Sequence, residues 1–270
     1  PERVLPIQQQ GEAINIFGNA LFRNDGESFS DVALNTGTET YWPWGVSSGD
    51  INADGYEDLF VTGSMNYPFR YGVNSLLLNN QGENFVDSEF ILGVEPRRNH
   101  RMATLWFEVD CGEKEHPICE ETGATGPVDV WGSVGSRTSV IFDLDNDGDL
   151  DIVTGEFNDQ PMVLISNLSE RKPDLHFVKV DLTGTTSNRD GLGATVRVYA
   201  DSLTLTQAYD GKSGYLSQSA YPLYFGLGDA DTIDHIEVMW PSGRRQTVPG
   251  PIATNQLIEV VEEGSTAPAP

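Results

Sequence analysis

Apolar residues along this chain of 270 residues come in short runs, separated by turns rich in glycine and aspartate. No long stretch places apolar residues every three to four positions, which an amphipathic helix requires. Glycine (28) and proline (15) are plentiful, and both residue types interrupt helices. The pattern therefore predicts an all-β protein built from short strands.

Two kinds of segment repeat along the first part of the chain. An aspartate-rich loop followed by an apolar run occurs at residues 50–63 and again at residues 143–155. A second element, at residues 19–31 and 74–87, has two apolar runs around a tight Asn/Gly turn, which is typical of a β-hairpin. Residues 161–167 look like a degenerate copy of the first strand of that hairpin. The alternation of hairpins and loop-strand segments predicts repeated units of short antiparallel strands.

The interval between the second and third hairpin copies is longer than the first interval, and the surplus lies at residues 97–134, which predicts an inserted loop. This insertion contains both cysteines of the protein, Cys111 and Cys119. We expect a disulfide between them, which in the chain-entropy model contributes about 2–3 kcal/mol. Two free thiols in a reducing compartment are the alternative. A zinc site with His116 is a poor one, since it offers three ligands.

After about residue 173 the aspartate-rich segments stop, and short alternating strands predict a small β-sandwich. We therefore divide the chain into residues 1–173, the sandwich at residues 174–263, and a Pro/Ala-rich linker or tail at residues 264–270. The predicted strands of the sandwich are His176–Leu182, Ala194–Ala200, Leu203–Tyr209, Pro222–Gly226, Ile233–Trp240 and Gln256–Val261.

The two aspartate-rich loops, loop 1 (residues 50–58) and loop 2 (residues 143–151), place oxygen-bearing side chains at positions 1, 3, 5 and 9. A glycine at position 6 permits a sharp turn, and position 7 is expected to supply a backbone carbonyl. Hard oxygen ligands on a flexible loop suit Ca²⁺. The predicted ligands are Asp50, Asn52, Asp54, Tyr56 and Asp58 in loop 1, and Asp143, Asp145, Asp147, Asp149 and Asp151 in loop 2.

Both loops resemble the first nine positions of an EF-hand loop, but the glutamate at position 12 is absent and a strand follows. The alternative is an aspartate-glycine turn that binds nothing, and two copies in the same register argue against it. We expect two calcium ions with a structural role, because clustered carboxylates repel one another without a cation. No histidine or lysine stands at a fixed spacing from either loop, so we assign no catalytic residue.

The aspartate loops with their following strands, and the Asn-x-Leu-Phe-Arg-Asn-x-Gly hairpin, resemble the FG-GAP/VCBS repeat. That resemblance implies blades of a β-propeller. From Asn188 onward the chain resembles the ASPIC/UnbV domain, which commonly follows such repeats in secreted acidic proteins. The matching segments are residues 188–198, 213–219, 224–229 and 236–244. The resemblance implies a partial β-propeller of two to three blades followed by a small β domain.

Propellers usually close with about four to eight blades, which is more than this chain provides. The chain begins at Pro1 without a signal peptide, so one explanation is a piece of a longer precursor. The other explanation is that another chain fills the gap, because an open set of blades exposes unpaired strand edges. The sequence leaves both open.

The charge balance limits the partners of this protein. It has 41 acidic and 16 basic residues, a net charge of −25, which repels nucleic acid and anionic membranes and attracts divalent cations. No apolar run approaches the roughly 20 residues that a membrane-spanning helix needs. We therefore expect neither nucleic-acid binding nor membrane insertion.

The preferred hypothesis is a secreted or cell-surface calcium-binding scaffold, not an enzyme, that binds a protein or glycan. The alternatives are a structural subunit that self-assembles into a surface layer or fibre and a polysaccharide-active enzyme. The inserted loop is one candidate contact region, and the aromatic segment at residues 41–44 is another, although packing between blades explains it as well.

Asn167 begins an N-glycosylation sequon. A small basic cluster could meet an acidic neighbour, with a solvated loop as the alternative; it consists of Arg97, Arg98 and Arg101.

Overall fold

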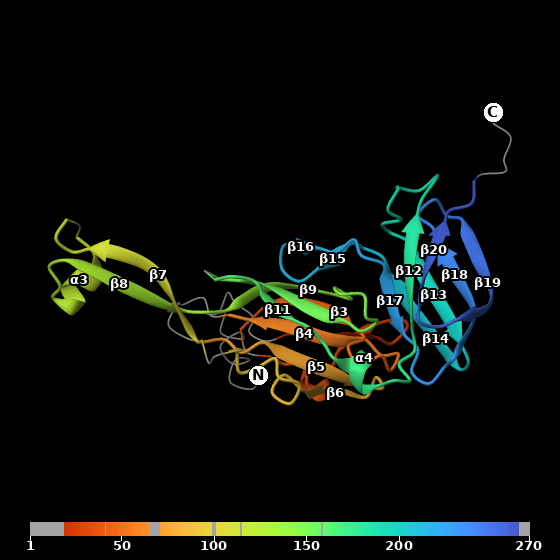
Figure 1. Ribbon diagram of the computed structural model, residues 1–270, viewed down its shortest axis with the longest axis horizontal. Coiled ribbons are helices and arrows are strands. Elements are labelled where there is room, and N and C mark those ends of the chain that lie inside the picture. Colours follow the sequence, from red (N-terminus) through yellow and green to blue (C-terminus); the bar gives the residue numbers. More distant parts are fainter. Residues whose placement is uncertain are drawn as a thin grey trace.

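The computed structural model describes residues 19–40, 42–64, 71–98, 101–113, 115–157 and 159–264. Strands dominate, so the prediction of an all-β chain is confirmed. The blade sheets lie in the middle, a sandwich at one end and a two-stranded arm at the other (Figure 1). Within the described ranges, no sheet closes into a barrel. None of the helices described is long and apolar enough to cross a membrane.

One blade is a four-stranded antiparallel sheet with the strand order β3-β4-β5-β6. The predicted hairpin at residues 74–87 is β5–β6, and its turn places Gln81 and Gly82 at positive φ, as a type I′ turn requires. Phe60 and Leu76 fill the blade interior. The strands are β3 (Pro43–Gly49), β4 (Asp58–Gly63), β5 (Ser75–Asn80) and β6 (Asn84–Asp87).

A second, three-stranded blade has the order β11-β10-β9 and lies against the first. Ile152 of this blade belongs to the same buried cluster as Phe60, so the two blades share a core. The predicted copy of the first hairpin strand at residues 161–167 is present as β11, but a short helix, α4 (Leu168–Arg171), follows it in place of a second strand. The strands are β9 (Ser136–Phe142), β10 (Asp151–Glu156) and β11 (Met162–Leu164).

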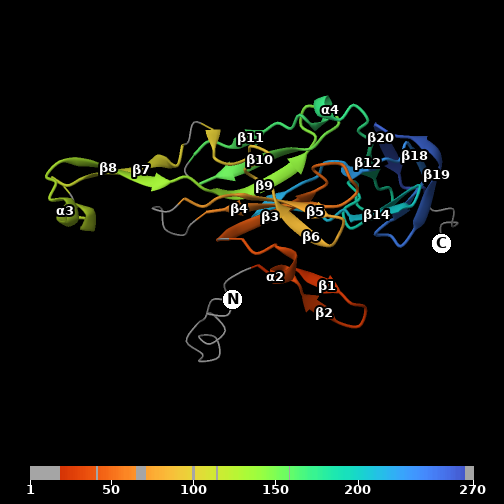
Figure 2. The same cartoon turned by 90° about the horizontal axis from the view of Figure 1, so that it is seen from below.

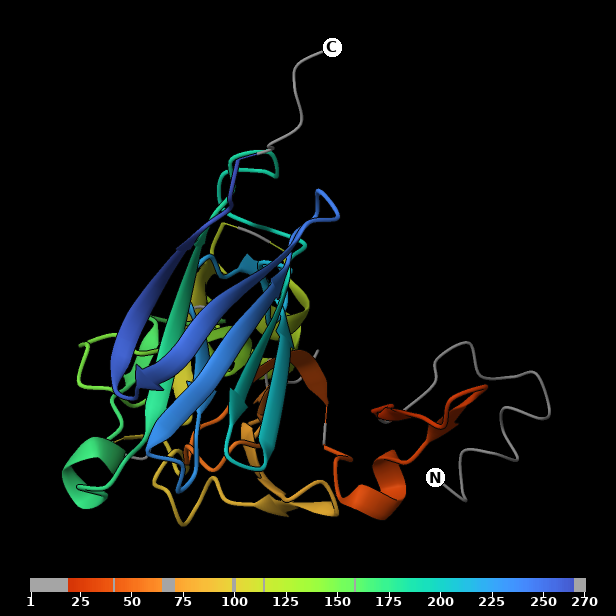
Figure 3. The same cartoon turned by 90° about the vertical axis from the view of Figure 1, so that its right-hand side faces the viewer.

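The predicted hairpin at residues 19–31 is present as β1 (Phe22–Asn24) and β2 (Phe29–Asp31), followed by the helix α2 (Ala33–Thr36). It stands apart from the blades (Figure 2; Figure 3). β1 pairs with β2 alone, whereas its counterpart β5 also pairs with β4. Phe22 and Phe29 are consequently exposed. The β1–β2 hairpin therefore corresponds to the two outer strands of a blade, β5 and β6.

The inserted segment forms an arm of two antiparallel strands, β7 (Ala103–Asp110) and β8 (Pro127–Ser133), with the helix α3 (Pro117–Thr122) at its tip. The predicted disulfide between Cys111 and Cys119 is present and closes the tip. His116 caps α3 by accepting a hydrogen bond from the Ile118 amide, so its role here is structural. The arm projects away from the blades (Figure 1).

The C-terminal sandwich packs the sheet β14-β13-β18-β19 on the sheet β17-β12-β20. All six predicted strands are present, and the buried side chains of Phe225, Ile236 and Trp240 lie between the sheets. β19 was not predicted, because two prolines argue against a strand; it is an edge strand, where proline is tolerated. The strands are β12 (Phe177–Thr183), β13 (Thr195–Ala200), β14 (Leu203–Ala208), β17 (Leu223–Gly226), β18 (Thr232–Met239), β19 (Arg245–Ala253) and β20 (Gln256–Val261).

A small hairpin leaves the sandwich between β14 and β17 and reaches the blades. Its strands are β15 (Lys212–Ser213) and β16 (Ser217–Gln218), and both contact β9. We call residues 211–219 the central hairpin. Figure 1 shows it lying beside β9 and β3, at a distance from the sandwich core.

The buried Glu262 ties the end of β20 to the turn after β12. Its carboxylate accepts hydrogen bonds from three successive amides and two hydroxyls. Burial raises the pKa of Glu262, but these hydrogen bonds lower it more, to about 2. The donors are the amides of Thr185, Thr186 and Ser187 and the hydroxyls of Ser187 and Ser242.

We expect Glu262→Gln to lower the melting temperature at pH 7 by several degrees and to flatten its acid dependence. The folded pKa of this carboxyl lies below the ordinary value of 4.5, so its contribution is fully present above pH 4.5. The contribution is lost as the pH falls from about 4.5 towards 2. Melting curves of both proteins between pH 2 and 7 test this, and curves that stay parallel would contradict it.

Candidate metal centre

Loop 1 joins β3 to β4 and loop 2 joins β9 to β10, at the blade ends that face the sandwich (Figure 1). The Gly228 amide donates to the Ala53 carbonyl at 3.3 Å, and the Tyr224 hydroxyl donates to the Gly148 carbonyl at 3.0 Å. A β-carbon added to Gly226 would lie 2.0 Å from Asp50 Oδ2. Both loops are therefore part of the junction between the blades and the sandwich.

In loop 1, backbone amides satisfy the two buried carboxylates at positions 1 and 9. Burial raises the pKa of Asp50 and of Asp58 to about 7, although the amides lower it. The described carboxylates of loop 1 form no group of three within 4.8 Å. The donors are Asp54 N (3.0 Å) and Gly55 N (2.8 Å) to Asp50, and Ile51 N (2.8 Å) and Asn79 N (2.7 Å) to Asp58.

The remaining predicted ligands of loop 1 bond to one another. The Asn52 side-chain amide donates to Asp54 Oδ2 at 2.9 Å, and the Tyr56 backbone N–H donates to Asp54 Oδ1 at 2.9 Å. Loop 1 is thus held closed by its own hydrogen bonds. Each carboxylate oxygen that accepts one bond keeps a second lone pair, so these bonds alone do not preclude a cation.

Loop 2 brings Asp143, Asp145 and Asp151 together, with one carboxylate oxygen of each within 4.8 Å of the others. The Asp143 side chain is 2 % exposed, and its Oδ1 has no hydrogen-bond partner. Burial raises the pKa of Asp151, whose two oxygens accept from the amides of Leu144 and Ser166. A convergent carboxylate group with an unpartnered buried oxygen fits a hard cation.

The other two aspartates of loop 2 turn towards α4. Asp147 Oδ2 accepts from the Ser169 hydroxyl at 2.6 Å, and Asp149 Oδ2 accepts from the Ser169 amide at 2.7 Å. The Oδ1 of Asp149 is buried and has no partner. Ser169 is the third residue of the sequon that begins at Asn167, and it lies in α4.

The ammonium group of a lysine lies beside loop 2, and it was not predicted from the sequence. Lys179, on β12 of the sandwich, donates from Nζ to Asp143 Oδ2 at 2.8 Å and lies 3.4 Å from Asn146 Oδ1. No local spacing signalled this contact, because Lys179 follows Asp143 by 36 residues. A calcium ion in loop 2 would share Asp143 with this ammonium group.

A cavity of about 790 Å³ lies beside loop 2, between the blades and the sandwich. Glu57, Asp143 and Lys179 are among the residues that line it, together with Tyr221. Burial raises the pKa of Glu57, which accepts a hydrogen bond from the Gln207 side chain. Charged and aromatic side chains from both parts of the chain therefore meet at the junction.

Residues 13–61 match the FG-GAP-like repeat family, and residues 184–267 match the ASPIC and UnbV family. The chain carries an FG-GAP-like repeat followed by an ASPIC and UnbV domain. The resemblance seen in the sequence is thereby confirmed. The first match covers β1–β2 and loop 1, and the second covers the central hairpin and most of the sandwich.

The chain is also similar to cartilage acidic protein 1 from two vertebrates. It is 29 % identical to the Xenopus tropicalis protein over 259 residues, which is 84 % of this chain and 38 % of that protein. It is 28 % identical to the Homo sapiens protein over 275 residues, which is 90 % of this chain and 40 % of that protein. The chain thus spans about two fifths of the length of these curated relatives.

The central hairpin of the ASPIC and UnbV domain bonds directly to the first strand of each blade. The Gly214 amide donates to the Val46 carbonyl at 3.0 Å, and the Ser213 hydroxyl donates to the Ser139 carbonyl at 2.9 Å. The Tyr215 ring meets the Trp44 ring edge-on at 5.4 Å. Trp44 therefore packs between blade and hairpin, which confirms packing for this member of the aromatic segment, while Tyr41 lies outside the described residues.

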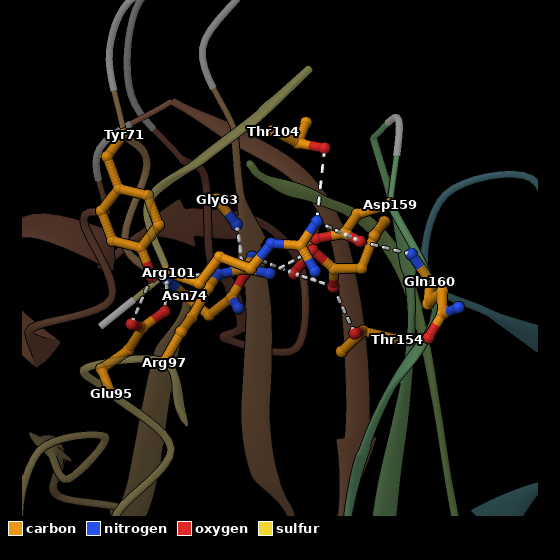
Figure 4. A network of polar contacts seen from close by, with 12 residues as sticks. Gly63, Tyr71, Asn74, Glu95, Arg97, Arg101, Thr104, Thr154, Asp159 and Gln160 are labelled. Carbon is orange, nitrogen blue, oxygen red and sulfur yellow. Dashed lines mark hydrogen bonds and ion pairs between the residues drawn. The ribbon is translucent and has the colours of Figure 1, made fainter. Parts of the chain in front are cut away.

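The arginines at residues 97–101 form no exposed basic cluster, because their partners are acidic. Arg97 is buried, pairs with Glu156 of the second blade, and donates to the Tyr71 hydroxyl at 3.0 Å (Figure 4). Arg101 pairs with Asp159 at 3.1 Å. Arg98 is exposed and forms no ion pair with the residues described. The hypothesis of a solvated loop is wrong for Arg97, which lies inside a polar network.

Proposed function

We propose that this chain belongs to an extracellular, non-enzymatic interaction scaffold in which calcium stabilises the junction between the FG-GAP-like blades and the ASPIC and UnbV domain. The convergence of three carboxylates in loop 2, directly beside the sandwich, carries this proposal. The disulfide at the tip of the arm supports an oxidising compartment. The name of the relatives, cartilage acidic protein, supports a place outside the cell.

Asp143, Asp145 and Asp151 would hold the ion in loop 2, and the unpartnered oxygen of Asp149 lies in the same loop. Calcium prefers about six to eight oxygen ligands, so water would complete the shell. When bound, the ion would neutralise the repulsion among these carboxylates and fix the turn between β9 and β10. We also propose loop 1 as a calcium site, on the weaker ground of its matching ligand spacing.

Calcium is expected to raise the melting temperature, and Asp145→Asn should remove the part of this gain that loop 2 supplies. At a free concentration 100-fold above the dissociation constant, one site contributes about 2.7 kcal/mol. Asp145 is exposed and repelled by the neighbouring carboxylates, so its substitution should not lower the stability of the calcium-free protein. The measurement is thermal unfolding with calcium and after chelation.

Asp174→Asn is the matched control, since Asp174 is exposed and lies outside both loops. This variant should respond to calcium like the parent protein. A parent protein that melts at one temperature with and without calcium would refute the calcium proposal. An Asp145→Asn variant that keeps the full calcium response would refute the assignment of loop 2 alone.

The second candidate is a structural subunit that self-assembles. The β1–β2 hairpin favours it, because Phe22 and Phe29 are exposed and the hairpin pairs with no inner strand among the described residues. Light scattering in calcium and after chelation distinguishes the two proposals. A mass that grows with protein concentration supports assembly, and a constant monomer mass supports the binding scaffold.

A further inference from the structure

The two faces of the β7–β8 arm differ in what covers them. Val109 and Val130 are buried on one face, where the Phe107 ring contacts the His116 ring at the start of α3. Side chains alternate along a strand, so Asp129 and Trp131 of β8 share the opposite face. The register pairs Leu105 with Trp131 and Glu108 with Asp129, so all four side chains lie on that face. We call these four residues the arm face.

The apolar pair of the arm face is open to solvent. Leu105 is 46 % exposed and Trp131 is 56 % exposed, although they stand directly opposite each other. A side chain as exposed as Trp131 removes little apolar area from water, so it contributes little to folding. Exposed tryptophan is, in contrast, enriched at binding surfaces.

The acidic pair of the arm face is destabilising as it stands. Glu108 and Asp129 are exposed like charges directly opposite each other, which destabilises a sheet. Neither forms an ion pair with any residue that the structure describes. The segment from residue 103 to residue 133 contains seven acidic residues and one lysine. A positively charged partner would remove this repulsion.

We propose that the arm face binds a polypeptide segment that presents arginine. This inference rests on the proposed interaction function and names the chemistry of the partner. A guanidinium group forms paired hydrogen bonds with carboxylates and stacks on tryptophan, so one residue type satisfies both halves of the arm face. Trp131 and Asp129 are two positions apart on one strand, about 7 Å, which is within reach of one arginine or two neighbouring ones.

A glycan fits the arm face less well. Sugar rings stack on tryptophan, but an uncharged sugar would leave the like charges of Glu108 and Asp129 facing each other. Lysine would neutralise these carboxylates, but it lacks the planar group that stacks on Trp131 and binds two carboxylate oxygens at once. The observations therefore favour arginine.

The test is the binding of synthetic octa-arginine and octa-lysine peptides to the full chain by calorimetry, at about 0.15 M salt, where weak long-range attraction is screened. Two variants each alter one half of the arm face: Glu108→Gln/Asp129→Asn removes its charges, and Trp131→Ala removes its aromatic ring. The control is Asp234→Asn/Glu259→Gln, which removes two exposed charges from the sandwich and so changes the net charge equally. The four substituted carboxylates, two in the arm and two in the control, all lie on strands. Trp131 is too exposed to be needed for folding.

We expect octa-arginine to bind more tightly than octa-lysine, and each arm variant to weaken octa-arginine binding at least tenfold. The control variant should weaken it less than twofold. Equal losses in the arm and control variants would overturn the proposal in favour of unspecific attraction to an acidic protein. Displacement of the peptide by neutral dextran, with Trp131→Ala sensitivity but no effect of the carboxylate variant, would overturn it in favour of a glycan.

Amide hydrogen exchange gives an independent readout. Octa-arginine should protect amides between residues 103 and 133, and protection elsewhere without protection there would contradict the proposal. The arm face touches neither loop 1 nor loop 2, so we expect the same affinity in calcium and after chelation. A protein that fails to respond to calcium would thus refute the calcium junction and leave the result for the arm face standing.

Discussion

Arg97→Met is expected to lower the free energy of unfolding by about 3–5 kcal/mol, because it leaves the Glu156 carboxylate buried without its counter-ion. The side chains of Arg97 and Glu156 are 8 % and 1 % exposed. Arg97 also donates to the Ser136 hydroxyl at 2.8 Å and to the Tyr71 hydroxyl. Methionine keeps much of the volume but supplies none of these hydrogen bonds. Urea unfolding followed by tryptophan fluorescence measures the effect.

Arg98→Met is a matched control, because it makes the same change at the next residue, which is exposed and has no described ion pair. It should alter the free energy by less than about 0.5 kcal/mol. Adding Glu156→Gln to Arg97→Met should restore part of the loss, since the buried charge is then gone. Similar unfolding of the two methionine variants would show that the buried pair does not stabilise the protein.

Gly45→Ala is expected to cost about 3 kcal/mol, the upper end of the usual range for overpacking. The new β-carbon would lie 2.4 Å from the Tyr215 amide nitrogen and 2.9 Å from the Gly214 carbonyl carbon. Both are backbone atoms of the central hairpin, so no side-chain rotation relieves the clash. The hairpin should therefore move away from β3 and lose the contact between Trp44 and Tyr215.

Gly126→Ala tests the same substitution where an added β-carbon meets nothing within 4 Å. It should unfold like the parent protein, whereas Gly45→Ala should also show faster proteolysis within residues 211–219. Near-ultraviolet circular dichroism reports the loss of the Trp44 contact directly. If Gly45→Ala keeps both the parent stability and the parent spectrum, the hairpin does not pack on β3 as described.

Local patterns predicted the local structure of this chain. The Asn/Gly turns predicted both hairpins, and the alternation of apolar and polar residues predicted six strands of the sandwich. The close spacing of the two cysteines predicted the Cys111–Cys119 disulfide. These features depend on residues near one another in the sequence. The same holds for the loop glycines, since Gly55 and Gly148 both adopt positive φ as the predicted turns require.

The features that could not be predicted from the sequence depend on contacts between distant segments. Loop 1 carries Asn52 where loop 2 carries Asp145, so the sequence already shows why only loop 2 brings three carboxylates together. The contact of Lys179 with Asp143, 36 residues away, left no such local signal. Arg97 lies 59 residues from Glu156, so its burial left no local trace. The central hairpin was missed as a pair of strands because each strand is two residues long and is stabilised by the blades.

The central hairpin also determines the order in which the chain can complete its fold. The Ser47 and Ser213 hydroxyls lie 3.0 Å apart but are separated by 166 residues. The blades leave the ribosome first, and their inner strands must wait for the hairpin before this contact can form. Closing so long a loop carries an entropic cost before any contact offsets it, so docking of the hairpin should be slow relative to formation of the local β-hairpins. During synthesis, the newly made blades therefore depend on residues that the ribosome has not yet translated.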